Sequence, residues 1–410
     1  MAQSAPCLIR RRVVGHRRGY RAWLRCRAVN LFAAVSSGDA AVLIVVVGAR
    51  LVVPLFIPRF PLPAMFAALV IDAADQTIFQ KMTDLDLTGY QSYDKALDVY
   101  YLAIAYTAVM RNWSSPYQHS VGAFLWYYRL VGVALFESTG ARWILFVFPN
   151  TFEYFFDVIE GIKVSWNPFR IAARWIVGIA AFIWIFIKLP QEWWIHIAQL
   201  DFTDFMKETV FGVPADSSWG DAIANAPLTA LAIVLAIVGL VALAWWGRRF
   251  LPPRDWDPTF SAETQAEHLG WPRGPRRVVP AAQFDRRFVE KVALLSLMVF
   301  VFSRMLPGTE GNALQVAIGV TLIIAASTGV SHLLARREVS WTSVAAEFGT
   351  MFVINALIGI AIGILLPGER SGPPLPEFLF LIGVLSLIVV LYDRATEIRR
   401  LRRPKQRNVT

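Results

Sequence analysis

Charged residues are scarce in this chain of 410 residues. Aspartate, glutamate, lysine and arginine make up 17% of it, against about 25% in typical soluble domains. Hydrophobic residues make up 56%, and many form runs of about 18 or more, the length of a membrane-spanning helix. This balance excludes a soluble enzyme, a secreted disulfide scaffold and a disordered protein. It places the chain in the membrane class.

Cysteine is almost missing, since Cys7 and Cys26 are the only two. Both lie in the basic N-terminal segment, so neither a disulfide nor a thiolate metal cluster is expected. The sequence also has no phosphate-binding loop, dinucleotide fingerprint, nucleophile elbow or zinc-protease motif. These absences argue against an ATP-driven pump and against the common membrane hydrolases. An internal repeat and paired broken helices, typical of many secondary transporters, are missing as well.

The net charge of +10 does not indicate a nucleic-acid partner, because the basic residues lie in loops and tails between apolar runs. Basic loops orient membrane helices with that side in the cytoplasm. The partner that this pattern predicts is the lipid bilayer, with anionic lipid at the basic segments. Arginine outnumbers lysine by 33 to 7, which is typical of a GC-rich bacterium and favours a bacterial plasma (inner) membrane.

Ten apolar runs predict an all-α polytopic membrane protein of about ten transmembrane helices. With ten spans every basic cluster falls on one side, which predicts that both termini and the 247–288 loop are cytoplasmic. The runs lie near residues 38–57, 96–112, 119–137, 142–162, 171–189, 226–246, 289–306, 313–335, 343–366 and 375–393.

An eleventh apolar run at 62–71 is only about ten residues long and is flanked by prolines. A helix of that length cannot cross a hydrocarbon core of roughly 30 Å. We therefore expect residues 62–71 to form a short re-entrant or interfacial element on the outer face.

The chain divides into five parts by composition. A membrane domain of six aromatic-rich helices with acidic outer loops precedes a cytoplasmic linker rich in proline and arginine. A second membrane domain of four plainer helices follows the linker, and basic cytoplasmic tails stand at both termini. The boundaries are 1–29 for the first tail, 30–246, 247–288, 289–393, and 394–410 for the second tail.

The fourth predicted span contains the first candidate site. Asn150, Glu153, Asp157 and Glu160 recur at helical spacing and form one polar stripe, and Pro149 is expected to kink the helix. Arg129 in the third span lies at the depth of Glu153. Because a lone charge at that depth is costly, the sequence predicts that Arg129 pairs with Glu153. Such a pair either fixes helix register or forms a substrate or proton site.

The first outer loop contains the second candidate site. Asp72, Asp75, Asp84 and Asp86 follow the short apolar run, and clustered carboxylates of this type can bind a divalent cation. A solvated acidic loop is the alternative. Asp98 begins the second span at its outer end, at a depth where Asp98 or Asp72 could pair with Arg50.

Two further regions have polar residues without a diagnostic motif. The segment from Pro190 to Gly212 alternates apolar and acidic residues, which favours a helix lying in the membrane interface. In the second domain, His332, Glu347 and Asn355 are the intramembrane polar residues, and they are typical of helix packing.

Three functions fit these features. The first is a transporter or permease, with Arg129, Asn150, Glu153, Asp157 and Asp98 along its pathway. The second is an enzyme, because the layout is similar to that of polytopic glycosyltransferases that use polyprenyl-phosphate sugars. That resemblance covers the topology and one acidic outer loop, and it implies a catalytic carboxylate among Asp72, Asp75, Asp84 and Asp86. The third is a membrane scaffold or assembly factor.

Overall fold

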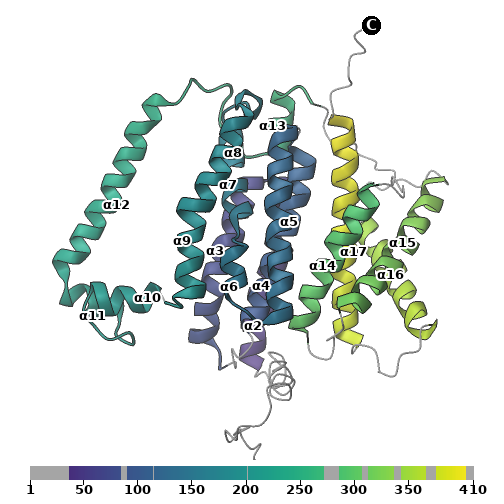
Figure 1. Ribbon diagram of the computed structural model, residues 1–410, viewed down its shortest axis with the longest axis horizontal. Coiled ribbons are helices and arrows are strands. Elements are labelled where there is room, and N and C mark those ends of the chain that lie inside the picture. The colour runs from purple at the N-terminus through teal and green to yellow at the C-terminus, as the bar shows by residue number, and fades with distance from the viewer. Residues whose placement is uncertain are drawn as a thin grey trace, which may run out of the picture.

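A computed structural model describes residues 37–84, 90–113, 115–200, 202–271, 286–306, 313–336, 343–365 and 375–402. Over these residues the chain is all-helical and has no β-strand (Figure 1). Seven helical segments are long and apolar enough to cross a membrane, so the membrane class expected from the sequence is confirmed at that level, while the count of ten is not. The seven are Gly38–Phe56, Pro61–Met82, Ala173–Ile197, Pro227–Phe250, Leu314–Ser331, Val344–Ile362 and Leu375–Arg402.

Helix α4 (Tyr90–Asn112) is the central helix of the molecule. All of its residues from Ala96 to Val109 are buried, although its first half contains several charged side chains. It packs against helices from both halves of the chain. These are α2 (Ser37–Val52) and α5 (Pro116–Thr139) in the first half, and α14 (Arg286–Met305) and α17 (Leu375–Arg402) in the second. The charges on α4 are therefore enclosed by other helices.

The prediction of a short re-entrant or interfacial element at 62–71 is wrong. These residues belong to α3 (Pro61–Met82), a single helix of 22 residues that is long enough to cross a membrane. The helix continues beyond the apolar run because Asp72 and Asp75 both bond to Arg50 of α2. Pairing with Arg50 lowers the cost of burying these two carboxylates inside the bundle. The length of the apolar run contains no information about this pairing. The 3-10 turn η1 (Val53–Phe56) leads from α2 toward α3.

The fourth predicted span is two helices, α6 (Trp143–Val147) and α7 (Thr151–Lys163). The chain leaves helical geometry between them, around Pro149. Proline lacks the backbone N–H that an uninterrupted helix would need here. The kink expected from the sequence is therefore a complete break.

The fifth span is longer than the sequence predicted. It comprises α8 (Ala173–Phe182), α9 (Leu189–Glu192) and two wide π-helical stretches, η3 (Ile183–Lys188) and η4 (Trp193–Ile197). The expectation of an interfacial helix from residue 190 is wrong for its first eight residues, which continue this span. Shorter helical pieces follow it: α10 (Phe202–Phe205), the π-helical η5 (Met206–Val210) and α11 (Trp219–Asn225).

Helix α12 (Pro227–Gly247) stands apart from the bundle in Figure 1. None of its residues is buried, and its close neighbours are α11 and the 3-10 turn η6 (Arg248–Phe250). A helix that is apolar on all sides is stable in this position only within lipid or against another protein.

The second half forms a bundle of α14, α15 (Ala313–Arg336), α16 (Val344–Leu365) and α17. Helices α14 and α17 also pack on α4 and α5, so the two halves share one large hydrophobic core.

The predicted linker packs onto one end of the bundle. Its short helix α13 (Ala262–His268) brings Glu263 to Arg111 of α4, and Arg402 donates to the Arg111 carbonyl at 3.0 Å. The backbone N–H of Ala262 donates to the Arg59 carbonyl at 2.9 Å. We call this the linker end, and the opposite end the far end.

The first and last described residues lie at opposite ends of the bundle. Helix α2 and helix α17 both run toward the linker end, where Pro58 and Arg402 lie, so Ser37 lies at the far end (Figure 1). The sequence placed both ends of the chain on one side. The described helices do not support that arrangement, because the full-length α3 is a further helix that is long enough to cross a membrane.

Candidate functional site

The break between α6 and α7 is completed by side chains from neighbouring helices. Arg129 Nη1 of α5 donates to the Phe148 carbonyl at 2.9 Å, and the Asn150 N–H donates to Glu192 Oε1 of α9 at 3.1 Å. Non-helical backbone at membrane depth persists only where protein or water satisfies its polar groups. Arg129 and Glu192 therefore stabilise the break directly.

A glycine on α5 lets the broken segment approach closely. A Cβ built on Gly132 would lie 2.1 Å from the Phe148 Cβ, which is far inside van der Waals contact. Phe148 in turn packs on Tyr128, with ring centroids 4.5 Å apart. The break thus depends on Pro149 for its geometry and on Gly132 for its space.

Glu153, in the first turn of α7, is buried among polar partners. The Tyr101 hydroxyl of α4 donates to Glu153 Oε2 at 2.8 Å, and Asn150 Nδ2 donates to the same oxygen. Lys188 Nζ of η3 lies 3.9 Å from Glu153 Oε1 and 3.8 Å from the centre of the Tyr154 ring. The positive end of the α7 dipole adds to the stabilisation of the carboxylate.

The expected pairing of Arg129 with Glu153 is wrong. The acidic partner of Arg129 is Glu192, with Nη1 and Oε1 4.0 Å apart, and His196 Nε2 lies 3.0 Å from Glu192 Oε2. The break at Pro149 turns the start of α7 toward α4 and η3, so Lys188 becomes the cation beside Glu153. We name Arg129, Glu153, Lys188, Glu192 and His196 the break cluster.

Sequence reasoning missed Lys188, Glu192 and His196. Their spacing of four residues places all three on one face of a helix, which is a signal that the sequence contains. The signal was lost because the predicted span ended at residue 189, which put the last two in an outer segment.

Several polar atoms around the break cluster have no hydrogen-bond partner among the described residues. They are Asn150 Oδ1, Thr151 Oγ1, Asp157 Oδ1 and His196 Nδ1, all nearly shielded from solvent. Buried polar atoms in proteins are almost always paired with protein or water, since an unpaired one costs about 1–3 kcal/mol. These four atoms belong to the segments on either side of the contact between Asn150 and Glu192, and each lacks a partner in the described part of the chain, which water or a polar ligand would supply. Glu160, the last residue of the predicted stripe, bonds instead to Lys163 and Trp113.

A second ionic cluster surrounds Arg50 on α2. Its guanidinium bonds to Asp72 and Asp75 of α3 and lies 3.3 Å from Asp98 Oδ1 and 3.4 Å from Asp94 Oδ1 of α4. Lys95 Nζ contacts Asp94 at 2.7 Å and Asp98 at 3.1 Å. The expected Arg50 pair is confirmed with both Asp72 and Asp98. We name Arg50, Asp72, Asp75, Asp94, Lys95 and Asp98 the Arg50 cluster.

The aspartates predicted to bind a divalent cation are separated by the structure. Asp72 and Asp75 belong to the Arg50 cluster. Asp84 is exposed two residues beyond the end of α3, and Asp86 lies outside the described residues. Asp94, which the sequence did not single out as a ligand, takes their place.

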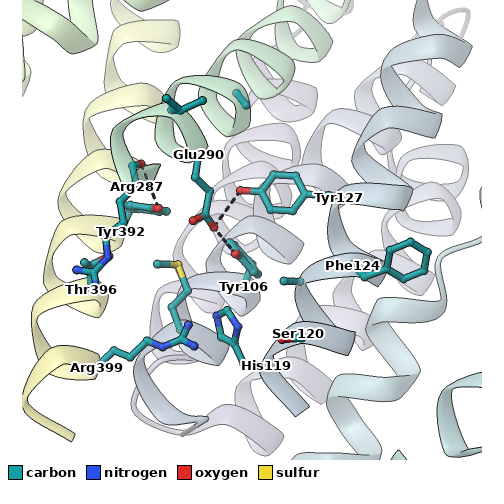
Figure 2. Close-up of a pocket in the computed structure, with 14 residues that line it drawn as sticks. Tyr106, His119, Ser120, Phe124, Tyr127, Arg287, Glu290, Tyr392, Thr396 and Arg399 are labelled. Atoms are coloured by element: carbon teal, nitrogen blue, oxygen red, sulfur yellow. Dashed lines mark hydrogen bonds between the residues drawn. The ribbon is translucent and has the colours of Figure 1, made fainter. Parts of the chain in front are cut away.

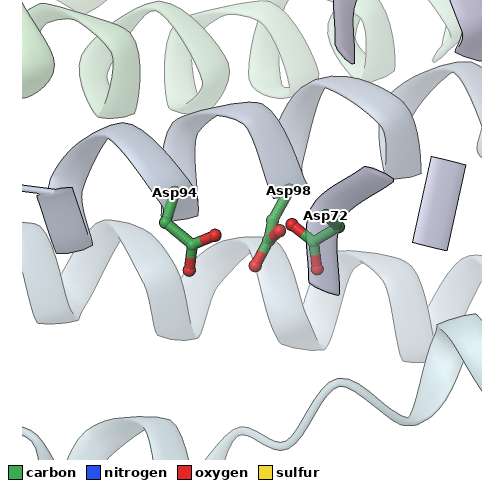
Figure 3. A group of neighbouring side chains, drawn as sticks. All are labelled: Asp72, Asp94 and Asp98. Atoms are coloured by element: carbon green, nitrogen blue, oxygen red, sulfur yellow. The ribbon is translucent and has the colours of Figure 1, made fainter. Parts of the chain in front are cut away.

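Three carboxylates of the Arg50 cluster could together hold a cation. One oxygen each of Asp72, Asp94 and Asp98 lies within 4.8 Å of the others, and all three side chains approach one another between α3 and α4 (Figure 3). Hard oxygen ligands of this type suit Mg²⁺, Mn²⁺ or Ca²⁺. Arg50 already contacts all three carboxylates, so a metal ion would have to share them with the guanidinium.

Helix α4 joins the two clusters. Asp94, Asp98 and Tyr101 follow one another at spacings of four and three residues and therefore share a face of the helix. The two aspartates belong to the Arg50 cluster, and Tyr101 donates to Glu153 of the break cluster. A polar path along one helix thus connects α2 with η3.

The polar residues of the second half join neighbouring helices. Asn355 Nδ2 of α16 donates to Ser386 Oγ of α17 at 2.9 Å, and Arg394 of α17 pairs with Glu347 of α16. These contacts have the packing geometry that the sequence favoured for Glu347 and Asn355. The side chain of His332 lies outside the described residues.

No protein-family model, curated protein or solved structure matches this chain. The geometry of the two clusters is therefore the basis for a function.

Proposed function

We propose that the chain is a multi-pass membrane transporter that moves a cation, or couples a solute to protons or another cation, through the break cluster. The observation that carries the proposal is the set of unpartnered polar atoms at an interrupted helix. Interrupted helices form the ion and substrate sites of many transporters, because their ends present free backbone dipoles at membrane depth. Ionisable residues at that depth are costly, and a functional site is the usual reason for their presence.

The charge balance favours a cation. Counting Asp157, seven carboxylates of the two clusters face four arginine and lysine side chains. A protein interior does not hold three uncompensated negative charges, so protons or metal cations must neutralise the excess. The carboxylates are Asp72, Asp75, Asp94, Asp98, Glu153, Asp157 and Glu192, and the cations are Arg50, Lys95, Arg129 and Lys188.

The proposed location is a bacterial plasma membrane, with the linker end in the cytoplasm. Arg111, Lys163, Arg248 and Arg402 lie at or next to that end, as cytoplasmic basic residues do. We propose eleven passes, in which α6 and α7 form one pass and α8 through η4 another. Ser37 then lies on the outer side, and the arginine-rich segment that precedes it departs from the rule that orients the other basic segments.

The two natural cysteines test this topology. Cys7 and Cys26 precede Ser37, so a membrane-impermeant maleimide should label the unmodified protein in spheroplasts. A cysteine at Glu267 of α13, in a variant with Cys7 and Cys26 replaced by serine, should react only after the membrane is opened. Labelling of Glu267→Cys alone in intact spheroplasts would reverse the orientation, and protection of the natural cysteines would restore the ten-span model.

Water access tests the transport site itself. In the same cysteine-free background, Asn150→Cys and Asp157→Cys should react with a small charged thiol reagent from one side of the membrane. Leu235→Cys on α12, which is exposed but surrounded by apolar residues, should not react. If both site cysteines stay unreactive from either side, water does not reach the break cluster. The cluster then only stabilises the fold, and the transport proposal fails.

Flux in proteoliposomes provides the direct measurement. An imposed potential, negative inside, should drive cation or proton entry that a pH-sensitive or Na⁺-sensitive dye records. Glu153→Gln should abolish it, whereas Glu208→Gln, an exposed carboxylate of η5, should leave it unchanged. An equal flux from the Glu153→Gln variant would contradict the assignment of the pathway.

A metal-dependent enzyme acting on a lipid-linked substrate is the second candidate. The convergence of Asp72, Asp94 and Asp98 favours it. Mn²⁺ binding, followed by electron paramagnetic resonance on the purified protein, should then be saturable and should be lost in Asp94→Asn. If Mn²⁺ binding is not saturable, the Arg50 cluster holds no metal ion. The hypothesis of a metal-dependent enzyme then has no support.

A further inference from the structure

A cavity of about 690 Å³ lies between the two halves of the molecule, near the linker end. Its walls come from α4, α5, α14 and α17 (Figure 2). This volume is in the range of about 300–1,000 Å³ that is typical of small-molecule sites. The cavity shares no residue with either ionic cluster, so a ligand in this cavity is independent of the proposed transport.

One side of the cavity is cationic. Arg287 lies at the start of α14, Arg399 lies three residues before the end of α17, and His119 lies in the first turn of α5. Figure 2 shows Arg399 and His119 reaching the same side of the cavity. Arginine recognises phosphate through two parallel N–H bonds, and basic pockets between membrane helices bind lipid head groups.

The single carboxylate in the lining is already engaged. Glu290 Oε1 accepts hydrogen bonds from the Tyr106 hydroxyl at 2.5 Å and the Tyr127 hydroxyl at 3.3 Å. Both bonds draw Glu290 toward α4 and α5 (Figure 2). Among the residues that line the cavity, two arginines therefore stand against one glutamate.

The opposite side of the cavity is apolar and open. Phe124 of α5 is 56% exposed and Val289 of α14 is 65% exposed, and both line the cavity. In a membrane these side chains contact acyl chains. Arg287 and Arg399 lie near helix ends, and Phe124 lies more than two turns into α5.

We propose that this cavity binds the phosphate head group of an anionic phospholipid from the leaflet at the linker end. Arg287 and Arg399 hold the phosphate, and the acyl chain leaves past Phe124 and Val289. A phosphate on an apolar chain satisfies both sides of the cavity, whereas a soluble phosphate would satisfy only the cationic side. The bound lipid would join α5 of the first half to α14 and α17 of the second.

The test is a titration of the purified full-length chain in detergent. Dioctanoyl phosphatidylglycerol should raise the melting temperature saturably, whereas dioctanoylglycerol and inorganic phosphate should not. In the double variant Arg287→Gln, Arg399→Gln the apparent affinity should fall by about tenfold or more. Arg400→Gln is the matched control, because Arg400 is the next residue on α17 but does not line the cavity, and it should keep the wild-type affinity.

A second variant leaves the arginines in place. Ala123→Phe fills the cavity from α5 and should also abolish the stabilisation by phosphatidylglycerol. Equal responses to phosphatidylglycerol and dioctanoylglycerol would overturn the head-group site. So would unchanged affinity in both the double variant and Ala123→Phe. Stabilisation by inorganic phosphate alone, lost in the double variant, would overturn the lipid source in favour of a soluble phosphorylated ligand.

Discussion

Some charged side chains are buried well inside the helices from α2 to η4, as at Asp75, Asp98 and Arg129, whereas the charges buried in the described parts of α14 to α17 lie near helix ends. In the first region they include Arg50, Asp75, Asp98, Arg129, Glu137, Glu153, Glu160, Lys163, Lys188 and Glu192; in the second they are Lys291, Glu347 and Arg402. Charges near helix ends can reach the interface at little cost, while charges at mid-depth need protein partners.

The difference divides the molecule into a region that contains the two candidate clusters and a region whose buried polar contacts are typical of helix packing. In the second region the mid-helix polar contact is neutral, between Asn355 and Ser386. In the first region every mid-depth charge named above as a member of a cluster has an opposite charge nearby. Such ionic networks are sensitive to the loss of one member, because the remaining charges stay buried.

The largest effect is expected from Arg50→Ala. It removes the guanidinium that faces four aspartates and leaves Lys95 as their cation. Breaking a buried ionic network by removing one partner costs about 3–5 kcal/mol. Arg394→Ala is the counterpart in the second region, and it should cost about 1–2 kcal/mol because Glu347 lies in the first turn of α16. Unfolding in detergent monitored by circular dichroism would compare them, and equal losses would refute the contrast between the regions.

The next effect is expected from Gly132→Ala. The added Cβ would meet the Phe148 Cβ, which is not a flexible group, so the broken segment must move. Overpacking of this type costs about 1–3 kcal/mol, and a contact this short belongs at the upper end. Gly329→Ala in α15 is the matched control, since no atom lies within 4 Å of its Cβ position. It should be neutral in the same unfolding assay, and a neutral Gly132→Ala would show that the break lies elsewhere.

The sequence predicted the helical class, the membrane character and most helix positions, because these depend on local apolar runs. It also placed Arg50, Arg129 and Glu153 within predicted spans, whereas it put Asp72 and Asp75 in an outer loop. It failed on α3, on the end of the fifth span and on the partner of Arg129. Each failure concerns a polar residue made tolerable by a partner far away in the sequence, such as Asp72 with Arg50. A prediction made from one segment at a time cannot identify a partner that lies in another segment.

A smaller effect tests the revised pairing at the break. In a double-mutant cycle, Arg129→Gln and Glu192→Gln should show a coupling of about 1–2 kcal/mol, since their charged groups lie 4.0 Å apart. The cycle of Arg129→Gln with Glu153→Gln should give less than about 0.5 kcal/mol, because Glu153 bonds to Tyr101 and Asn150. A larger coupling in the second cycle would reinstate the pairing that the sequence predicted.

The smallest effect is expected from the neutral contact of the second region. Asn355→Ala removes the hydrogen bond from Asn355 Nδ2 to Ser386 Oγ, and such bonds between membrane helices contribute about 0.6 kcal/mol on average. Ser386→Ala alone should cost slightly more, because it leaves the buried amide of Asn355 without this partner and its Oδ1 has none among the described residues. The double variant Asn355→Leu, Ser386→Ala should return close to the wild-type stability, since two apolar groups then replace the pair. The same detergent unfolding assay measures all three.

A loss of stability near that of Arg50→Ala would mean that α16 and α17 depend on buried polar contacts as strongly as α2 to α4. The contrast between the two regions would then be refuted.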